Sequence, residues 1–454
     1  MLRRLFALLT LAAVLVACGA PAASSPTAPA VEPTPAAEAP AAAEEPTVEQ
    51  PTVAPVSGNR TTLGLWTHSA GNAGEMEAIT QMVNDFNAGQ EQYAIQIEAF
   101  PQASYNDSVA AASVAGSLPC IIDLDGPTVP NFAWSGYVQP LPIDDALLGE
   151  LSPAAVGTYK GEVYSVGQFD VALLIYGRRS VLEQHDIRIP TLDEPWTRDE
   201  FMAALDTLKG SDEFEYAFDL NPGYTGEWWS YAYSPMLQSF GGDLIDRETF
   251  TEAEGVLNGP EAIAWGEWFQ GLFADGYANP TPADDQGFLQ GRVPLWYTGS
   301  WSANDAVAAY GDDLLFLPTV DFGAGPKIGG ASWQWGISSA CASPEGAWQF
   351  IEYMLQPEQV ALMSNTTGLI PTTEAAAALT ENYAEGGKYR VFFDMAQRFA
   401  VLRPETPGYL TISNQFEQAG LAIRDGADVQ DTLDDAVDAI EQDIQDNAGY
   451  GFED

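Results

Sequence analysis

The strongest constraint on the fold is an alternation of strand-like and helix-like patterns early in the chain. Residues 61–67 (TTLGLWT), 93–100 (YAIQIEAF) and 119–125 (PCIIDLD) have the composition of β-strands. Between them, residues 75–87 carry apolar side chains at helical spacing, and residues 105–115 are compatible with a second helix. This order predicts an α/β lobe whose strands pair mostly in parallel.

The same alternation continues to the end of the chain. Residues 170–176 and 293–297 predict strands, and Thr197 with Glu200 forms a capping-box pattern that opens a helix reaching residue 208. Three more helices are expected at residues 262–273, at 344–355 with Ser343 as the cap, and at 431–446. One α/β sheet rarely absorbs so many elements, so two α/β lobes are expected.

The N-terminus has the pattern of an export signal. Arg3 and Arg4 precede an apolar run, residues 5–16, that is too short to span a bilayer, which predicts a signal peptide at residues 1–17. The ending Leu-Val-Ala-Cys resembles a bacterial lipobox, a signal in which the cysteine, Cys18, is lipidated and becomes the mature N-terminus. An ordinary secretory signal with a chance cysteine is the alternative. Lipidation would supply more than one acyl chain, enough for stable attachment.

Residues 18–58 are predicted to be the lipid anchor and a disordered tether. Proline, alanine, threonine, serine and glutamate dominate this stretch, which cannot bury a core. No later segment has about 18 uninterrupted apolar residues, so no transmembrane helix is expected. The sequence therefore predicts a globular body in the cell envelope, outside the cytoplasm and anchored to the membrane through Cys18.

The charge balance excludes one class of partner. The chain has 17 Lys and Arg residues against 64 Asp and Glu residues. Nucleic acid needs many cations to neutralise its phosphates, and anionic lipid surfaces repel such a chain. The acidic residues are scattered along the chain, so they are interpreted as a source of solubility.

Motifs of catalysis are missing from the sequence. Carboxylates are too abundant for spacing to nominate a glycosidase pair. The only histidines, His68 and His185, have no metal-ligand spacing, and there is no G-x-S-x-G elbow, P-loop or dinucleotide fingerprint. The sequence therefore favours a protein that is not an enzyme and that needs no cofactor or metal.

Aromatic and acidic residues gather at the predicted ends of strands and beside glycines. Ligands of open α/β sheets bind beyond the carboxyl ends of strands. Aromatic faces stack on sugar rings, and carboxylates accept hydrogen bonds from sugar hydroxyls. Core packing is the alternative for each tryptophan taken alone. The candidate ligand-binding residues are Trp66, His68, Asp123, Asp125, Trp228, Trp229, Tyr231, Trp301, Trp333 and Trp335.

Short motifs spread over the body resemble one family in the order in which that family has them. The motifs are LGLWTHSAG, AAASVAGSLPCIIDLDG, WSGYVQPL, YKGEVYSVG, TRDEF, FGGDLID, GRVPLWYTGSW, GGASWQWGIS, SPEGAWQFIEYML and TGLIPT. Each is weak by itself, and the ordered set is strong. From about residue 61 onward the chain resembles the extracellular solute-binding proteins of carbohydrate ABC importers, the class that includes maltose-binding protein.

The resemblance implies a two-lobe, periplasmic-binding-protein-like α/β fold of type II, with a ligand cleft between lobes that close by hinge motion. It implies an N-terminal lobe of residues 59–168 plus 303–342 and a C-terminal lobe of residues 169–302 plus 343–454. Chain crossings are then expected near Gln168 and Phe169, near Ser302 and near Ser343. The resemblance also places Trp66, Trp301, Trp333 and Trp335 on the cleft, with Arg403 either at its rim or in a structural salt bridge.

Three positions depart from the family pattern. Cys120 stands where the family usually has aspartate, Val166-Gly167 where proline is usual, and Tyr176-Gly177 where the family has Tyr-Asn. The family fold brings the strand after Pro119 and the strand ending near Cys341 into one lobe. The resemblance therefore implies a Cys120–Cys341 disulfide, with two free buried thiols as the alternative.

The resulting hypothesis is a membrane-tethered lipoprotein that captures a sugar or oligosaccharide and delivers it to the permease subunits of an ABC importer. It is expected to be a monomer. A secreted carbohydrate-active hydrolase on the same tether is one alternative. A binding protein for another solute, such as a peptide or polyamine, is the other.

Overall fold

The computed structural model describes residues 60–330 and 332–452. The expected signal peptide, Cys18 and the tether lie outside these residues. The chain divides into two units, residues 1–49 and 50–454, and every described residue belongs to the second. Within the described ranges no helix combines the length and the apolar character that crossing a membrane requires.

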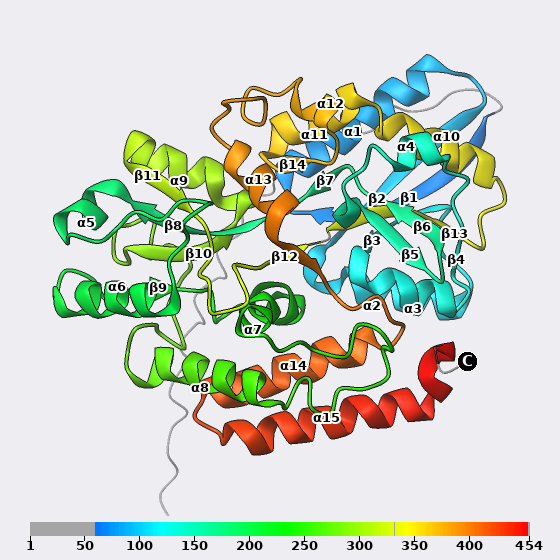
Figure 1. The fold of residues 1–454 in the computed structure, drawn as a ribbon. Helices are drawn as coiled ribbons and strands as arrows, with labels where there is room; N and C mark the ends of the chain where they lie inside the picture. The colour runs from blue at the N-terminus through cyan, green and yellow to red at the C-terminus, as the bar shows by residue number, and fades with distance from the viewer. Residues whose placement is uncertain (1–59, 331, 453–454) are drawn as a thin grey trace, which may run out of the picture. The chain divides into compact units, whose positions relative to one another are not determined.

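A seven-stranded sheet forms the first lobe (Figure 1). Strand β1 lies between β2 and β3 and pairs with both in parallel, whereas β13 pairs antiparallel with β3, β6 and β4. The expectation of mostly parallel pairing is therefore right for the first three strands and wrong for the others, because β13 returns to this sheet from a distant part of the chain. In sheet order the strands are β2 (Tyr93–Pro101), β1 (Thr61–Ala70), β3 (Ile121–Asp125), β13 (Trp333–Ser338), β6 (Glu162–Val166) and β5 (Val156–Tyr159), with β4 (Val138–Gln139) beside β13.

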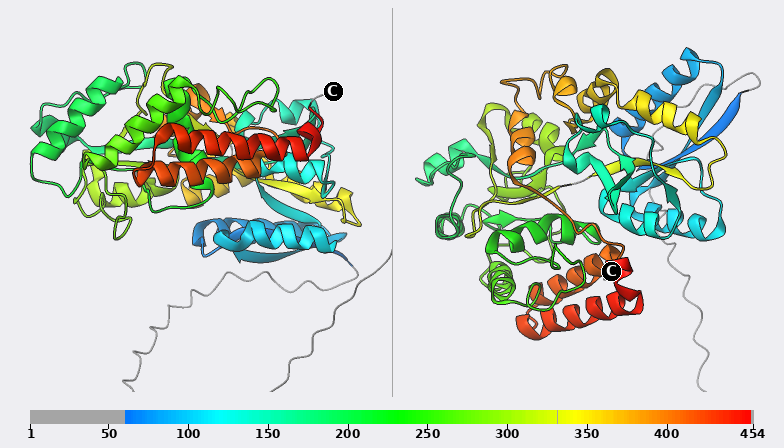
Figure 2. Two further views of the ribbon diagram at one scale, coloured as in Figure 1. Left: turned by 90° about the horizontal axis from the view of Figure 1, so that it is seen from below. Right: turned by 45° about the vertical axis from the view of Figure 1, so that its right-hand side comes forward.

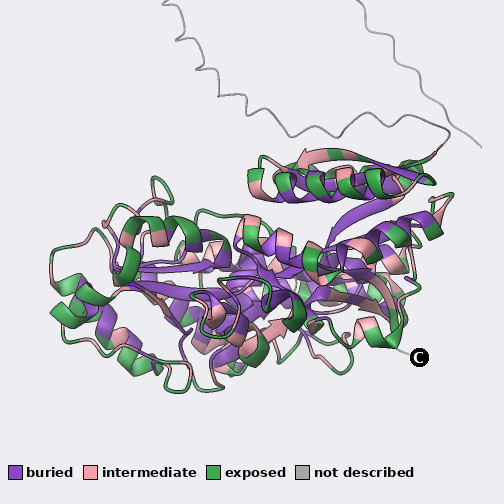
Figure 3. Cartoon of the chain, turned by 90° about the horizontal axis from the view of Figure 1, so that it is seen from above, coloured by how far each residue is buried: buried purple, intermediate pink, exposed green. Residues whose placement is uncertain are grey.

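Helices cover both faces of this sheet. In β3, successive side chains point alternately to one face and to the other. Ile121 joins a core with α1 (Ala73–Gly89), α10 (Pro344–Met354) and α11 (Pro357–Thr367). The next residue, Ile122, joins a second core with α2 (Gln102–Ala115) and α3 (Val129–Trp134). Alternation along the strand therefore places Asp123 and Asp125 on the same face as Ile121. Figure 3 shows the inner strands buried, an outer strand partly exposed and the outer helix faces exposed.

A disulfide between Cys120 and Cys341 joins the residue before β3 to the segment after β13, with a Cα–Cα distance of 4.4 Å. The pairing implied by the family resemblance is present in the structure. It connects two neighbouring strands of one sheet from cysteines that are 221 residues apart in sequence.

We expect removal of this disulfide to lower the free energy of unfolding by about 3 kcal/mol, because the crosslink restrains a very long loop of the unfolded chain. Thermal unfolding of the Cys120→Ser/Cys341→Ser variant, beside the wild type with and without reductant, measures the effect. The reductant should leave the double-serine variant unchanged. An equal melting temperature for the wild type and the double variant would contradict the prediction.

A four-stranded sheet forms the second lobe, in the order β11 (Leu314–Leu317), β8 (Leu173–Arg178), β10 (Leu295–Gly299) and β9 (Phe218–Asp219). Its core is rich in aromatic residues; Trp196, Trp229, Trp265, Tyr233 and Phe269 are among its fully buried side chains. The helices that surround it are α5 (Arg179–Gln184), α6 (Arg198–Gly210), α7 (Ser234–Phe240), α8 (Pro260–Ala274), α9 (Ala303–Tyr310), α13 (Arg390–Phe399), α14 (Tyr409–Arg424) and α15 (Val429–Asp446).

Two helix starts test the capping predictions. Thr197 and Glu200 exchange both bonds of a capping box at the start of α6, which confirms the prediction. Ser343 is the N-cap residue of α10, as expected, but its side chain makes no cap hydrogen bond. Pro344 begins this helix, also as expected, since its missing N–H and its fixed φ suit the first turn.

Two short strand pairs lie between the sheets: β7 (Phe169–Asp170) with β14 (Ile370–Pro371), and β12 (Ile328–Gly330) with β15 (Ala400–Leu402). The expected crossing near Gln168 and Phe169 coincides with β7. The remaining short elements are α4 (Asp145–Leu148), α12 (Glu374–Ala377), η1 (Gly126–Thr128), η2 (Pro153–Ala155), η4 (Ser300–Ser302), η5 (Gly311–Asp313), η6 (Ala448–Gly451) and the π-helix η3 (Trp229–Tyr233).

The crossings expected near Ser302 and Ser343 are not where the chain changes sheets. Strand β11 follows Ser302 and still bonds to β8 in the second sheet, while α10 follows Ser343 and buries Phe350 and Ile351 in the core of the first. The chain passes between the sheets in the segment that joins β11 to β13. The lobe limits remain a proposal, and we propose to move residues 303–317 to the second lobe and residues 343–367 to the first.

Candidate functional site

Arg403 occupies the junction of the two lobes. It directly follows β15, and only 5% of its surface is exposed. Its Nη1 donates a hydrogen bond to Oε1 of Glu227, its Nη2 lies 3.5 Å from Oδ1 of Asp125, and its guanidinium lies over the ring of Tyr231 at 5.1 Å. Arg403 thereby connects the end of β3 in the first lobe to the segment before η3 in the second.

Glu227 is the centre of the hydrogen bonds around this arginine. Its carboxylate accepts bonds from Arg403, from the hydroxyl of Tyr409 and from the hydroxyl of Ser413, the last at 3.0 Å. Tyr409 and Ser413 lie in the first turns of α14, so the network also ties this helix to the junction.

Burial sets the electrostatics of the junction. Burial raises the pKa of Asp125 to about 7, although Arg403 opposes the rise. Burial also raises the pKa of Asp170 to about 7, against a hydrogen bond from the backbone of Val171. Burial opposes the charge of Arg403, but the carboxylates of Asp125 and Glu227 outweigh it and raise the pKa of the guanidinium. A buried guanidinium thus pairs with two carboxylates, of which Asp125 is buried and Glu227 is half-buried.

Four aromatic rings form a cluster beside Arg403, which we call the aromatic cluster: Tyr224, Trp228, Tyr231 and Trp301. The Trp301 ring lies 6.2 Å from the rings of both Trp228 and Tyr231, and the rings of Tyr224 and Trp228 are 5.3 Å apart. Trp301 and Tyr224 keep 38% and 37% of their surface exposed, whereas Trp228 and Tyr231 are buried. The cluster therefore presents two large aromatic side chains to solvent.

The backbone around the cluster requires glycine. A Cβ at Gly299 would lie 2.1 Å from the Trp301 ring, and a Cβ at Gly329 would lie 2.3 Å from the carbonyl oxygen of Tyr231. The glycines in GRVPLWYTGSW and GGASWQWGIS therefore let Trp301 and Tyr231 approach the backbone closely.

Two hydroxyl groups at the cluster have no hydrogen-bond partner among the described residues. They belong to Tyr231 and to Ser300, the neighbour of Trp301, and both oxygens are buried. Buried polar groups normally have a partner, and an unpaired one costs free energy. These two hydroxyls are therefore candidates to bond a polar ligand or ordered water.

The two tryptophans of GGASWQWGIS have different surroundings. Trp335 is 4% exposed, lies in the core of the first lobe and donates its indole N–H to Gln168 at 3.2 Å. Trp333 is half-buried at the start of β13 and stacks on His68, with ring centroids 3.7 Å apart. Trp335 therefore packs in the core of the first lobe, and we no longer propose it as a ligand contact.

Other candidate residues are also core or network residues. Trp229 is fully buried, and its ring packs against Gly420, where a Cβ would lie 2.5 Å from it. Trp66 is half-buried, packs against Phe100 and donates its indole N–H to Glu98 at 2.7 Å. Trp229 therefore belongs to the core of the second lobe, and we no longer propose it as a ligand contact.

His68 and Asp123 lie in a buried network below Trp333. Nδ1 of His68 is 2.6 Å from Oδ2 of Asp123, and Nε2 is 3.3 Å from Oε2 of Glu75. Burial opposes a positive charge on the imidazole, but the two carboxylates outweigh it and raise the pKa of His68 to about 10. His68 and Asp123 therefore bond to each other inside the first lobe, and their role as ligand contacts stays a prediction.

We expect this histidine to make stability depend on pH. Its folded pKa of about 10 exceeds its ordinary value of 6.5, so the stabilisation is complete below pH 6.5 and is lost as the pH rises through 10. At about 1.4 kcal/mol per pKa unit, His68→Gln should lose several kcal/mol of unfolding free energy near neutral pH.

Thermal melts of His68→Gln and the wild type between pH 6 and 10 check this dependence. The gap between their melting temperatures should shrink as the pH rises. His185→Gln, at the only other histidine, is the matched control and should follow the wild type. A gap that stays constant over this range would contradict the prediction.

Several residues of the junction were missed by sequence reasoning. Glu227 and Asp170 were hidden by the abundance of carboxylates, although Glu227 directly precedes the Trp228-Trp229 pair. Tyr224, Tyr409 and Ser413 carry no local pattern that separates them from other surface or helix residues. By contrast, Asp125, Trp228, Tyr231, Trp301 and Arg403, all candidates from the sequence, do lie together.

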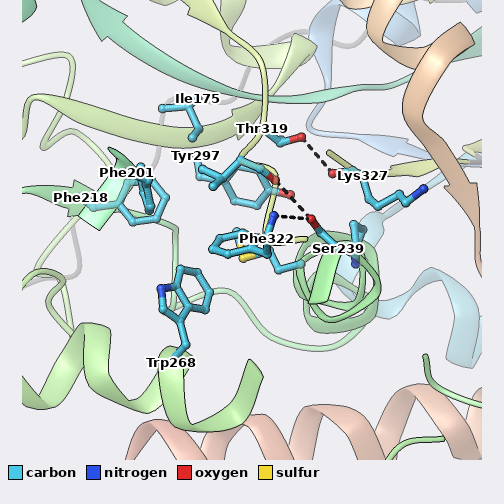
Figure 4. A pocket seen from close by; sticks show the side chains of 12 residues that line it. Ile175, Phe201, Phe218, Ser239, Trp268, Tyr297, Thr319, Phe322 and Lys327 are labelled. Atoms are coloured by element: carbon cyan, nitrogen blue, oxygen red, sulfur yellow. Dashed lines mark hydrogen bonds between the residues drawn. The ribbon is translucent and has the colours of Figure 1, made fainter. Parts of the chain in front are cut away.

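Two small cavities, each with a volume of about 10 Å³, lie in the second lobe and at the junction. The first, shown in Figure 4, is lined mainly by apolar residues of the core of the second lobe, including Phe201, Trp268 and Phe322. The other lies between the first lobe and the segment after β15, against Pro127, Gly157, Arg403 and Glu405. Each has room for about one water molecule, so neither holds a sugar ring as it stands. Within the described ranges no group of three or more potential ligands could hold a metal ion.

Comparison with known proteins decides the family. The family model described as bacterial extracellular solute-binding protein matches residues 81–390. The chain belongs to this family. A maltooligosaccharide ABC transporter solute-binding lipoprotein of Streptococcus pneumoniae serotype 4 is 21% identical over 365 residues, which cover 76% of this chain and 80% of that protein.

Solved structures show the same fold. The GacH receptor of Streptomyces glaucescens, whose structures include a complex with acarbose, matches with a TM-score of 0.72 and 19% identity over 86% of this chain and 100% of that one. A cyclic α-maltosyl-1,6-maltose binding protein of Arthrobacter globiformis matches with a TM-score of 0.71 and 23% identity over the same shares. This solute-binding protein therefore has the two-lobe α/β fold of periplasmic binding proteins.

Proposed function

We propose that this solute-binding protein captures a sugar or oligosaccharide outside the cell and delivers it to the permease of an ABC importer, without catalysing a reaction. The observation that carries the proposal is the aromatic cluster, in which Trp301 and Tyr224 expose more than a third of their surface. Exposed aromatic rings beside a buried polar network are the combination that sugar binding uses, since a sugar has an apolar face and polar edges.

The polar groups of the junction suit the edges of a sugar. The unpaired hydroxyls of Tyr231 and Ser300 can donate or accept a hydrogen bond. Asp170 accepts a bond from the backbone N–H of Val171 and retains further acceptor capacity for a ligand hydroxyl. The ligand would therefore stack on Trp301 and bond to Tyr231, Ser300 and Asp170.

The relatives support both the ligand class and the location. Their names connect them to maltooligosaccharide uptake and call them lipoproteins. The sequence pattern ending at Cys18 agrees with a lipid anchor, followed by the tether of residues 18–58. We therefore propose attachment of the body to the outer side of the membrane and transfer of the ligand to permease subunits.

The geometry speaks against the two alternatives. A hydrolase needs one carboxyl to give up a proton and a second to act on the sugar. At this junction Arg403 holds both Asp125 and Glu227, which favours a structural role for the pair. The same guanidinium neutralises the carboxylates that a polyamine would need. A neutral polar ligand fits the site best.

The test is a fluorescence titration of the purified protein with a panel of mono- and oligosaccharides, a peptide mixture and spermidine. We expect saturable change with one class of sugar and no release of shorter sugars on incubation. A response to the peptides or to spermidine alone would contradict the proposed ligand class and leave the family membership unchanged. Release of shorter sugars would contradict the proposal that the protein catalyses no reaction.

A further inference from the structure

The C-terminal end of the chain forms a strained turn. Helix α15 ends at Asp446, and the next turn holds Ala448, Gly449, Tyr450 and Gly451 at φ values of +50°, +63°, +52° and +75°. Positive φ is costly for alanine and tyrosine and persists only where surrounding contacts impose it. The conformation of this turn therefore needs an explanation in its contacts.

Residues of the second lobe, to which the turn belongs, hold it from one side. Tyr450 is 5% exposed, belongs to the core of that lobe and donates its hydroxyl proton to Oδ2 of Asp443 on α15 at 2.7 Å. Phe452 packs against Phe250 of the same lobe, with ring centroids 5.4 Å apart. The turn is thus built onto α15 and moves with it.

On its other side the turn contacts the first lobe. The ring of Trp134, the last residue of α3, meets the ring of Tyr450 edge-on at 5.1 Å. The hydroxyl of Tyr159 donates to the carbonyl oxygen of Tyr450 at 3.4 Å, and Nζ of Lys160 donates to that of Gly451 at 3.1 Å. Lys160 itself has a φ of +49°, so both partners are strained where they meet.

No covalent crossing of the chain lies at this contact. The chain passes between the lobes in the segments that carry β7, β12 and β14, whereas the C-terminal turn lies at the end of the described residues (Figures 1 and 2). Neighbouring bonds extend the contact: Asn131 on α3 donates to the carbonyl oxygen of Pro407 at 2.9 Å, and Thr158 donates to Glu405 at 3.4 Å. The lobes therefore meet here through side chains that can separate.

We propose that the C-terminal turn is a clasp: it docks on Trp134, Tyr159 and Lys160 of the first lobe and favours the joined arrangement of the lobes over an open one. Contacts from both lobes hold the strained turn, so separation of the lobes removes the share that Trp134, Tyr159 and Lys160 supply. A weakened clasp should let the ligand escape faster, and this consequence rests on the proposed function. The clasp between the lobes does not depend on the proposed function.

Pulsed electron paramagnetic resonance on the ligand-free, full-length protein tests the clasp. In a Cys18→Ser background, spin labels at Glu77→Cys on α1 and Ala203→Cys on α6 report the distance between the lobes, since both positions are exposed. Loss of one aromatic edge contact should raise the ratio of long to short distances about fivefold. We expect this change in Trp134→Ala and in Tyr450→Ala.

Trp134 is 44% exposed, so Trp134→Ala removes the contact without opening a core, and its melting temperature should stay near that of the wild type. The double variant Trp134→Ala/Tyr450→Ala should open no further than Tyr450→Ala alone, because the two residues share one contact. Val114→Ala, which removes an exposed apolar side chain from α2 in the same lobe as Trp134, is the matched control. A distance distribution in Trp134→Ala identical to the wild type would overturn the clasp, whether or not any sugar binds.

Discussion

Replacement of Trp301 by alanine is expected to weaken sugar binding by roughly 10- to 100-fold, the loss typical of a central aromatic contact. Trp301 is the exposed member of the aromatic cluster nearest to the unpaired hydroxyls of Tyr231 and Ser300. Isothermal titration calorimetry with the sugar found in the fluorescence titration measures the effect directly and does not depend on a tryptophan signal.

The exposure of Trp301 separates a binding defect from a folding defect. Since 38% of its surface already faces solvent, Trp301→Ala should change the melting temperature little. Trp301→Phe keeps a stacking face and should retain part of the affinity. Leu379→Ala, at a side chain with 53% exposure outside the cluster, should bind like the wild type. Unchanged affinity in Trp301→Ala would remove the aromatic cluster from the proposed site.

Replacement of Arg403 by methionine is expected to destabilise the protein by about 3–5 kcal/mol, because it leaves the buried Asp125 and the half-buried Glu227 without their cation. The ion pair Arg403–Asp125 joins side chains that are 4% and 10% exposed. Arg188→Met breaks an ion pair with Glu200 whose members are 39% and 43% exposed, and should cost less than about 1 kcal/mol. Chemical denaturation of both variants measures the difference.

The pH dependence of Arg403→Met identifies the cause of its instability. The pKa of Asp125 is already raised to about 7 in the presence of Arg403, and loss of the cation raises it further. A carboxyl with a raised folded pKa destabilises the protein increasingly as the pH rises from its unfolded to its folded value. The variant should therefore lose more stability at pH 8 than at pH 5. Addition of Glu227→Gln should restore part of the loss, and an equal loss at both pH values would contradict the mechanism.

The elements of the first lobe were predictable because their patterns are local. The strand at residues 61–67, the helix at 75–87 and the strand at 93–100 lie within β1, α1 and β2. Apolar spacing reports which face of an element is buried whatever covers it. The π-helix η3 has no such signal, because Trp229 to Tyr233 are all buried and show no periodicity.

The candidate site shows the same difference between residues with a local pattern and residues without one. Sequence reasoning found aromatic and acidic residues near strand ends, and the structure brings Asp125, Trp228, Tyr231, Trp301 and Arg403 together. Sequence reasoning could not find the role of Glu227, because the bond between Arg403 and Glu227 joins residues 176 positions apart. It also could not place the β11 and α10 segments in the right lobe, because pairing with distant strands decides lobe membership.

Alternation along a strand follows from the order of residues, so Trp333 and Trp335 share a face of β13. What covers that face at each position depends on segments that are distant in the chain. Trp335 lies further along the strand, where the core of the first lobe and Gln168 enclose it, whereas Trp333 begins the strand and meets His68. Periodicity depends on residues that are close in sequence, whereas burial and side-chain contacts depend on residues that are close in space.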